Sequence, residues 1–107
     1  MPKVTLDGKC ILDWAAFHAL AKTAFGFPEF YGNTMDAFVD CLSYLRDDES
    51  MCQFRLKAKE ILELEIIHSD AIGDPDLLEE LAFCIEGINE RYADYGEATA
   101  LKLHVIK

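Results

Sequence analysis

Basic residues are scarce in this chain of 107 residues. It holds ten Lys and Arg against twenty Asp and Glu, which gives a formal net charge of −10 at pH 7. Such a charge is repelled by nucleic acid phosphates and by anionic lipid surfaces, so direct binding to either is disfavoured. Many acidic proteins use their charge only to stay soluble. The informative question is therefore where the acidic residues lie.

Long apolar runs and an export signal are also missing. No uninterrupted apolar stretch reaches the roughly 20 residues that span a bilayer. Met1–Lys3 leads directly into Val4–Leu6 instead of into a signal peptide. We therefore expect a cytoplasmic protein without membrane contact. Because 51% of the residues are hydrophobic, we expect residues 1–107 to form a single domain with its own core.

The cysteines form no metal or redox motif. Cys10, Cys41, Cys52 and Cys84 are widely spaced, without a Cys-x-x-Cys pair. This spacing indicates neither a zinc site nor a thioredoxin-like motif. We interpret the cysteines as reduced thiols that serve as small buried apolar side chains, and we expect no metal and no other cofactor.

No group of residues indicates an enzyme. His18, His68 and His104 fall on a predicted helix and two predicted strands, without the spacing of a catalytic triad. A structural role is the simpler interpretation of each. Paired aspartates can act as an acid and a base, but an exposed helix face gives little desolvation to separate their pKa values. We therefore predict that the chain is not an enzyme.

Apolar periodicity and turn residues predict three strands and three helices. In chain order they are a strand at 3–6, helices at 14–25 and about 34–45, a strand at 61–68, a helix from Asp74 and Pro75 to about Tyr92, and a strand at 100–106. Strands separated by helices predict an α/β fold, a small and mainly parallel three-stranded sheet packed with helices. The weak alternation of residues 51–58 is compatible with an extra edge strand or a hairpin arm.

Two aspartates of the second predicted helix fall opposite its apolar stripe. At about 100° per residue, Phe38, Leu42 and Leu45 form the stripe, while Asp36 and Asp40 lie one turn apart on the other side. That side also carries Val39, Ser43 and Tyr44. Two like charges at this spacing destabilise an isolated helix by a few tenths of a kcal/mol. A solvated face and a binding face are both compatible with the pattern.

Aromatic residues near these aspartates favour a binding face. Phe30 and Tyr31 lie on the loop before the helix, where Pro28 and Gly32 break the helical pattern, and Tyr44 lies near its end. Rigid aromatic side chains beside charged groups are typical of protein interfaces.

The segment from Phe27 to Leu42 resembles the stretch that carries the nuclease-binding loop and helix in the barstar family. The Pro-Glu-Phe-Tyr-Gly run at 28–32, the Asp36-Ala37 pair and the Asp-Cys-Leu run at 40–42 fall at the family's offsets. The resemblance continues without a gap from Val4 to Leu42, and beyond it only the order of elements agrees. It implies a parallel three-stranded sheet with helices, and a stoichiometric inhibitor of a basic secreted or injected ribonuclease, such as an immunity protein or antitoxin.

The resemblance also implies the residues of the binding site. Asp40 matches the dominant hot-spot carboxylate of the family, Asp36 a second acid and Phe30 the loop aromatic. Glu86 is the candidate for a glutamate that a later helix contributes. The expected partner-binding residues are Phe30, Tyr31, Asp36, Val39, Asp40, Tyr44 and Glu86. The family has a tyrosine, a tryptophan and an asparagine where this chain has Phe30, Val39 and Thr34, and the stretch 46–60 is longer here, which points to a target of different shape.

The chemistry of such an inhibitor follows from its target. A ribonuclease holds phosphate with Arg, Lys or His, and a carboxylate can take the same place with bidentate hydrogen bonds. Asp40 would then mimic a phosphate, Asp36 would pair with a second cation, and the remaining negative charge would speed encounter. The alternative is an acidic adaptor whose basic partner is not a nuclease. Either way we expect the free chain to be a monomer.

Overall fold

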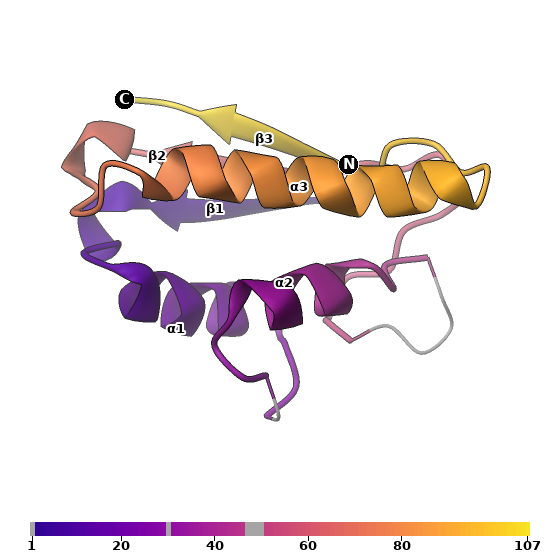
Figure 1. The fold of residues 1–107 in the computed structure, drawn as a ribbon, viewed down its shortest axis with the longest axis horizontal. Helices are drawn as coiled ribbons and strands as arrows, with labels where there is room; N and C mark the ends of the chain where they lie inside the picture. The colour runs from indigo at the N-terminus through magenta and orange to yellow at the C-terminus, as the bar shows by residue number, and fades with distance from the viewer. Residues whose placement is uncertain (1, 30, 47–50) are drawn as a thin grey trace.

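Three parallel strands form the sheet of this protein. The computed structural model describes residues 2–29, 31–46 and 51–107. Strand β2 (Leu62–Ile67) lies between β1 (Lys3–Asp7) and β3 (Leu101–Val105). Both pairings are parallel, so each strand reaches its neighbour through a long crossover that carries helices. This α/β fold is the one that the order of elements predicts (Figure 1).

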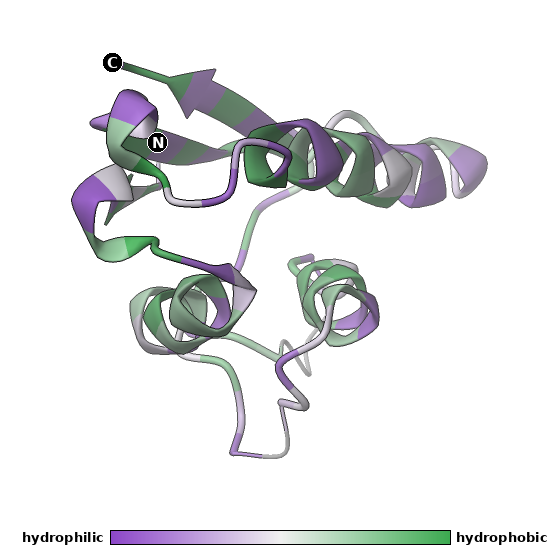
Figure 2. Cartoon of the chain, turned by 60° about the vertical axis from the view of Figure 1, so that its left-hand side comes forward, coloured by the Kyte–Doolittle hydropathy of each residue, from purple (hydrophilic) through white to green (hydrophobic). Residues whose placement is uncertain are grey.

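The two faces of the sheet differ in polarity. Val4, Leu64 and Leu103 are in register across the three strands and face the core. The opposite face carries polar pairs such as Lys3 and Glu65, whose Nζ and Oε2 atoms are 3.2 Å apart. Figure 2 shows the resulting alternation of hydrophilic and hydrophobic residues along the strands. Only one face of the sheet is therefore suited to pack against helices.

Two helices, α1 (Trp14–Phe25) and α3 (Leu77–Asp94), pack against the sheet, and α2 (Met35–Leu42) packs against α3. Helix α1 begins and ends as predicted. The side chain of Asp13 accepts a hydrogen bond from the backbone of the first turn. Gly26 ends the helix with φ 70°, a left-handed conformation that glycine adopts without strain.

Helix α2 begins as predicted but ends earlier. Thr34 caps it by accepting a hydrogen bond from a backbone N–H of the first turn. The helix ends at Leu42, three residues before the predicted end at Leu45. The reason is the buried hydroxyl of Tyr92, which donates to the carbonyl of Leu42 at 2.8 Å and accepts from the N–H of Leu45 at 2.9 Å. A side chain from α3 thus satisfies backbone groups that another helical turn would have used.

Helix α3 begins two residues later than predicted. Asp74 was expected as its cap, but the helix starts at Leu77 with Asp76 in the capping position. The carboxylate of Asp74 instead accepts from the N–H of Asp76 at 2.9 Å, and its carbonyl accepts from Leu77 at 3.3 Å. Asp74 therefore closes a turn ahead of the helix.

Residues 51–58 form no strand, so the extra edge strand suggested for this segment is absent. The N–H of Gln53 donates to the carbonyl of Phe25 at 2.9 Å, and that of Leu56 donates to Leu45 at 2.7 Å. The segment therefore bonds to the end of α1 and to the chain just after α2, and not to a sheet edge. Leu56 is buried in the core beneath it.

The side chain of Arg46 fixes the far end of this segment. Its guanidinium is only 5% exposed and lies over the ring of Tyr92, with the carbon 5.2 Å from the centroid. It donates to four backbone carbonyls, those of Lys57, Glu60, Ala98 and Thr99. Arg46 thereby joins the chain after α2 to the connection between α3 and β3.

An aromatic cluster holds α1 and α2 together. The ring of Phe38 lies 5.6 Å from that of Phe17, 6.0 Å from Phe25 and 6.1 Å from Phe27. Phe17, Phe25 and Phe38 are fully buried. Cys41 packs beside them as a buried free thiol. The expectation that all four cysteines are buried holds for Cys41 alone, although none of the four forms a disulfide. Among the described residues, no helix is both long and apolar enough to cross a membrane.

Candidate partner-binding face

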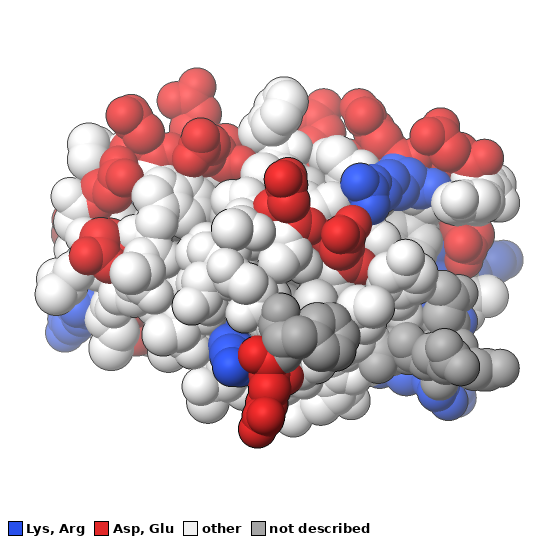
Figure 3. Space-filling model, turned by 60° about the horizontal axis from the view of Figure 1, so that its bottom comes forward, with Lys and Arg blue, Asp and Glu red and all other residues white. Residues whose placement is uncertain are grey.

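The outer side of α2 presents two carboxylates to solvent. Asp36 and Asp40 are exposed, the latter with 63% of its side-chain surface accessible. Phe38 and Leu42 on the inner side are fully buried. Figure 3 shows acidic side chains over this region and along the neighbouring helix. The positions of the two carboxylates agree with the helical periodicity, and their role in binding a partner remains a prediction.

A basic residue from α3 meets this acidic pair. Nη1 of Arg91 lies 3.3 Å from Oδ1 of Asp40 and donates to Oγ of Ser43 at 3.3 Å. The Arg91 side chain is 53% exposed, so the ion pair lies at the surface and contributes little to stability. It does fix Asp40 relative to α3. The sequence did not single out Arg91, because the pair joins positions 51 residues apart.

The thiol of Cys84 lies between the acids of the two helices. Burial raises its pKa, and the negative charges of Glu80 and Asp36 raise the pKa further. Cys84 precedes Arg91 by seven residues, about two turns, so both are on the side of α3 that meets α2. Glu80 is thus an acid of α3 close to the α2 face, and sequence reasoning missed it.

Glu86, the late-helix candidate, lies elsewhere. It is exposed on α3, but five residues separate it from Arg91, which turns it by about 140° around the helix. Glu86 therefore points away from the side of α3 that meets α2. The α3 residue beside Asp40 is Arg91, and a role of Glu86 in binding a partner stays a prediction.

Tyr31 differs from the expectation that its ring offers contact surface. It is 5% exposed, with its ring centroid 4.7 Å from that of Phe27. A 2.6 Å hydrogen bond joins its hydroxyl to Nδ1 of the buried His18. Burial, followed by the nearby Cys41 thiol, raises the pKa of Tyr31, and burial lowers the pKa of His18. Tyr31 therefore anchors the loop before α2 from beneath.

The remaining predicted residues divide between the core and the rim. Val39 is half-buried and packs against the core, which leaves it a partial contact surface. Tyr44 is 40% exposed and, with Arg91 and Tyr95, lines a cavity of about 500 Å³ between the ends of α2 and α3. Phe30 lies outside the described residues.

The histidines do not gather around the acidic face. His18 is in α1, Nδ1 of His68 lies 3.1 Å from a carboxylate oxygen of Asp7 after β2, and His104 is in β3. Their polar neighbours are Tyr31, Asp7 and Glu63, respectively, and neither Asp36 nor Asp40 is among them. Within the described parts of the chain, no three His, Cys, Asp or Glu side chains are arranged to hold a metal ion.

A parallel three-stranded sheet, covered by helices that expose a pair of carboxylates, defines a small α/β protein with an acidic face. The sequence model of the Barstar family, described as barnase inhibitor, matches residues 1–104. The chain belongs to this family, whose members are inhibitors and not enzymes. No curated protein matches the sequence.

Proposed function

We propose that this chain is a stoichiometric inhibitor of a basic ribonuclease and acts as an immunity protein or antitoxin. It inserts the acidic side of α2 into the active site of the nuclease. The observation that carries this proposal is the position of Asp36 and Asp40. Both are exposed one turn apart on a helix whose other side is fixed in the core.

The geometry of Asp40 suits the role of a phosphate mimic. One carboxylate oxygen contacts Arg91, and no described side chain donates to the other. A carboxylate accepts several hydrogen bonds, so Asp40 retains capacity for the cations that hold phosphate in a nuclease. Asp36, one turn earlier, is placed to meet a second cation at the rim.

Rigidity supports the same proposal. The cluster around Phe38 fixes the inner side of α2, and Tyr31 with His18 fixes the loop that enters it. A binding surface that is already ordered loses less conformational entropy when a complex forms. We therefore expect tight binding without rearrangement of α2.

The proposed setting is the cytoplasm, where the free chain is a monomer and meets a secreted or injected nuclease. Four cysteines that form no disulfide suit a reducing compartment. The net charge of −10 favours a basic protein as partner over nucleic acid.

Titration of barnase with this protein tests the function directly. RNA cleavage should fall linearly to zero at a molar ratio of one. A chain that carries both Asp36→Ala and Asp40→Ala serves as the control and should leave cleavage intact. If barnase and a panel of other basic ribonucleases stayed active in excess inhibitor, the proposal would fail. Retained binding to basic proteins that are not nucleases would then support the acidic adaptor.

A further inference from the structure

A positively charged residue, Arg91, lies within the acidic face. Arg91 contacts Asp40 and Ser43 through Nη1 alone, each at 3.3 Å. Its guanidinium donates no other hydrogen bond to a described residue, and 53% of the side chain is exposed. The remaining N–H groups of the five that a guanidinium carries therefore face water in the free chain.

Those N–H groups need acceptors once a partner covers them. A buried donor without an acceptor costs the desolvation of that group, and the cost is larger for a charged donor. A nuclease surface made only of Lys and Arg supplies no side-chain acceptor and also repels Arg91. A carboxylate supplies both charge and geometry, because it can accept two parallel N–H bonds from one edge of a guanidinium.

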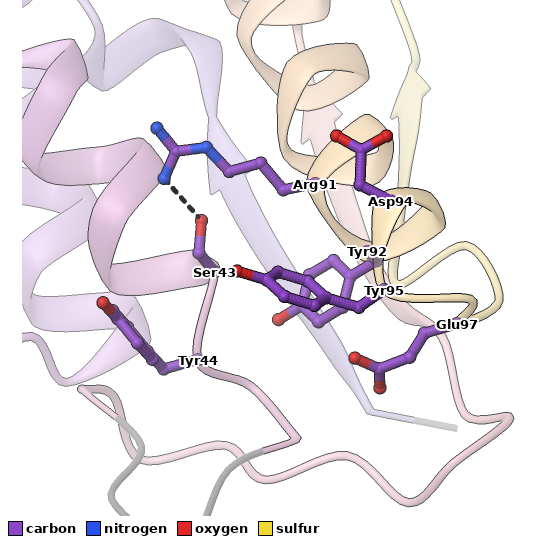
Figure 4. Close-up of a pocket in the computed structure, with 7 residues that line it drawn as sticks. All are labelled: Ser43, Tyr44, Arg91, Tyr92, Asp94, Tyr95 and Glu97. Carbon is purple, nitrogen blue, oxygen red and sulfur yellow. Dashed lines mark hydrogen bonds between the residues drawn. The ribbon is translucent and has the colours of Figure 1, made fainter.

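The structure leaves room for such a group next to Arg91. The cavity of about 500 Å³ opens between the ends of α2 and α3. Figure 4 shows Arg91 extended toward Ser43 on one side of it, with tyrosine rings below. Two of these, Tyr44 and Tyr95, are 40% and 83% exposed. A side chain of the partner can enter here without displacing the core.

The acids that line the cavity restrict where a carboxylate can bind. Glu97 lies 3.7 Å from Arg46, and the Asp94 carboxylate points away from Ser43 in Figure 4. Asp40 already lies 3.3 Å from Nη1 of Arg91, so a second carboxylate has to bind the guanidinium nitrogens that Asp40 and Ser43 do not contact.

We propose that Arg91 is a specificity-determining residue. It selects ribonucleases that present a carboxylate beside their phosphate-binding cations, so that Asp40, Arg91 and this carboxylate form an alternating chain of charges in the complex. The inference rests on the proposed function. The nuclease surface that this chain recognises then carries both signs of charge, with cations that meet α2 and an anion that meets α3.

A charge-reversal cycle with barnase as the probe tests this inference. Each Lys or Arg around the barnase active site is replaced singly by Glu, and the dissociation constant of every variant is measured with the natural chain, with Arg91→Glu and with Lys102→Glu. Lys102 is exposed on β3, so its substitution lowers the net charge by the same two units away from the face. Circular dichroism checks that each variant is folded.

The expected result is at least one Glu substitution in barnase that tightens binding to the natural chain and to Lys102→Glu, and weakens binding to Arg91→Glu. The coupling between the two positions should be about tenfold or more. If Arg91→Glu and Lys102→Glu responded alike to every barnase variant, the inference would be overturned while the inhibitor function stood. If none of the three chains bound barnase or any other ribonuclease of the titration panel, the proposed function would fail and the inference with it.

Discussion

Asp40 is held in place before any partner arrives. Its contact with Arg91 restrains the side chain, and its 63% exposure keeps the second oxygen accessible. Restraint of this kind lowers the entropy that a surface carboxylate loses on binding. The same contact must be preserved or replaced in the complex, so Asp40 and Arg91 are energetically coupled there.

Replacing Asp40 tests the hot spot. Asp40→Ala should weaken ribonuclease binding by several kcal/mol, above the threshold of about 2 kcal/mol that marks hot spots, because the cations of the nuclease would be buried without a partner. Inhibition constants measure the effect. Asp70→Ala removes the same charge at an exposed position of the turn Ser69–Ala71 and should change binding little. Equal affinities for the two variants would contradict the assignment.

His18 predicts a pH dependence of stability. Burial holds its pKa below the ordinary value of 6.5, so the unfolded chain takes up a proton at a higher pH than the folded chain does. Between those two pKa values the unfolded state binds more protons, and the free energy of unfolding falls as pH falls. The contribution of His18 is therefore complete above pH 6.5 and is lost below it.

Urea unfolding between pH 8 and pH 5 measures this loss. The free energy of unfolding should decline from about pH 6.5 downward in the natural chain. His18→Gln should flatten the decline whatever its effect at pH 8, whereas His104→Gln should keep it. A decline of the same size in His18→Gln would show that other groups cause it.

Residue positions on α2 were predictable from the sequence, and contacts between helices were not. The turn of about 100° per residue separates Asp36 and Asp40 from Phe38 without any tertiary information. Arg91, Glu80 and the burial of Tyr31 depend on how α3 and α1 pack against α2. Aromatic residues such as Tyr31 are important in both cores and interfaces, so the sequence pattern alone misplaced it.

At the scale of elements, α2 depends on its environment. It has only eight residues, fewer than the roughly 12 that an isolated helix needs to be stable in water. Its stability therefore comes from packing of Phe38 and Leu42 and from the Tyr92 hydroxyl at its end.

Phe38→Ala should remove a large part of that packing. The side chain is fully buried among three other phenylalanines, so we expect a loss of about 3–5 kcal/mol in the free energy of unfolding. Chemical denaturation measures it. Phe83→Ala, at a position that is 75% exposed, should cost less than about 0.5 kcal/mol. A small effect at Phe38 would mean that α2 is not anchored as described.

The elements themselves followed from local signals, and their ends did not. The predicted ends of α1 at Asp13 and Gly26 are confirmed, because capping depends on neighbouring residues. The end of α2 is set by Tyr92, fifty positions away. Residues 51–58 alternate weakly like a strand, yet their backbone hydrogen bonds go to Phe25 and Leu45. Where the local sequence was compatible with two structures, hydrogen bonds to distant residues decided which one formed.

At the scale of the whole molecule, the net charge of −10 governs encounter. Long-range attraction to a basic nuclease should raise the association rate and make it sensitive to salt. We expect the association rate measured by stopped flow to fall by about tenfold or more between 0.02 M and 0.5 M NaCl, because the Debye length shortens to a few ångströms. The dissociation rate should change far less. A rate independent of salt would exclude electrostatic steering.

The parallel pairing of β1 with β2 has a consequence for protein synthesis. In the sheet, β1 pairs only with residues 63–67, so the first strand emerges from the ribosome long before its partner exists. The segment with Asp36 and Asp40 leaves the ribosome after β1 and before β2, while β1 still has no paired neighbour. Since α2 also needs Tyr92, the acidic face forms only after α3 has been made, and a chain interrupted before residue 92 would hold Asp36 and Asp40 on an unfinished surface.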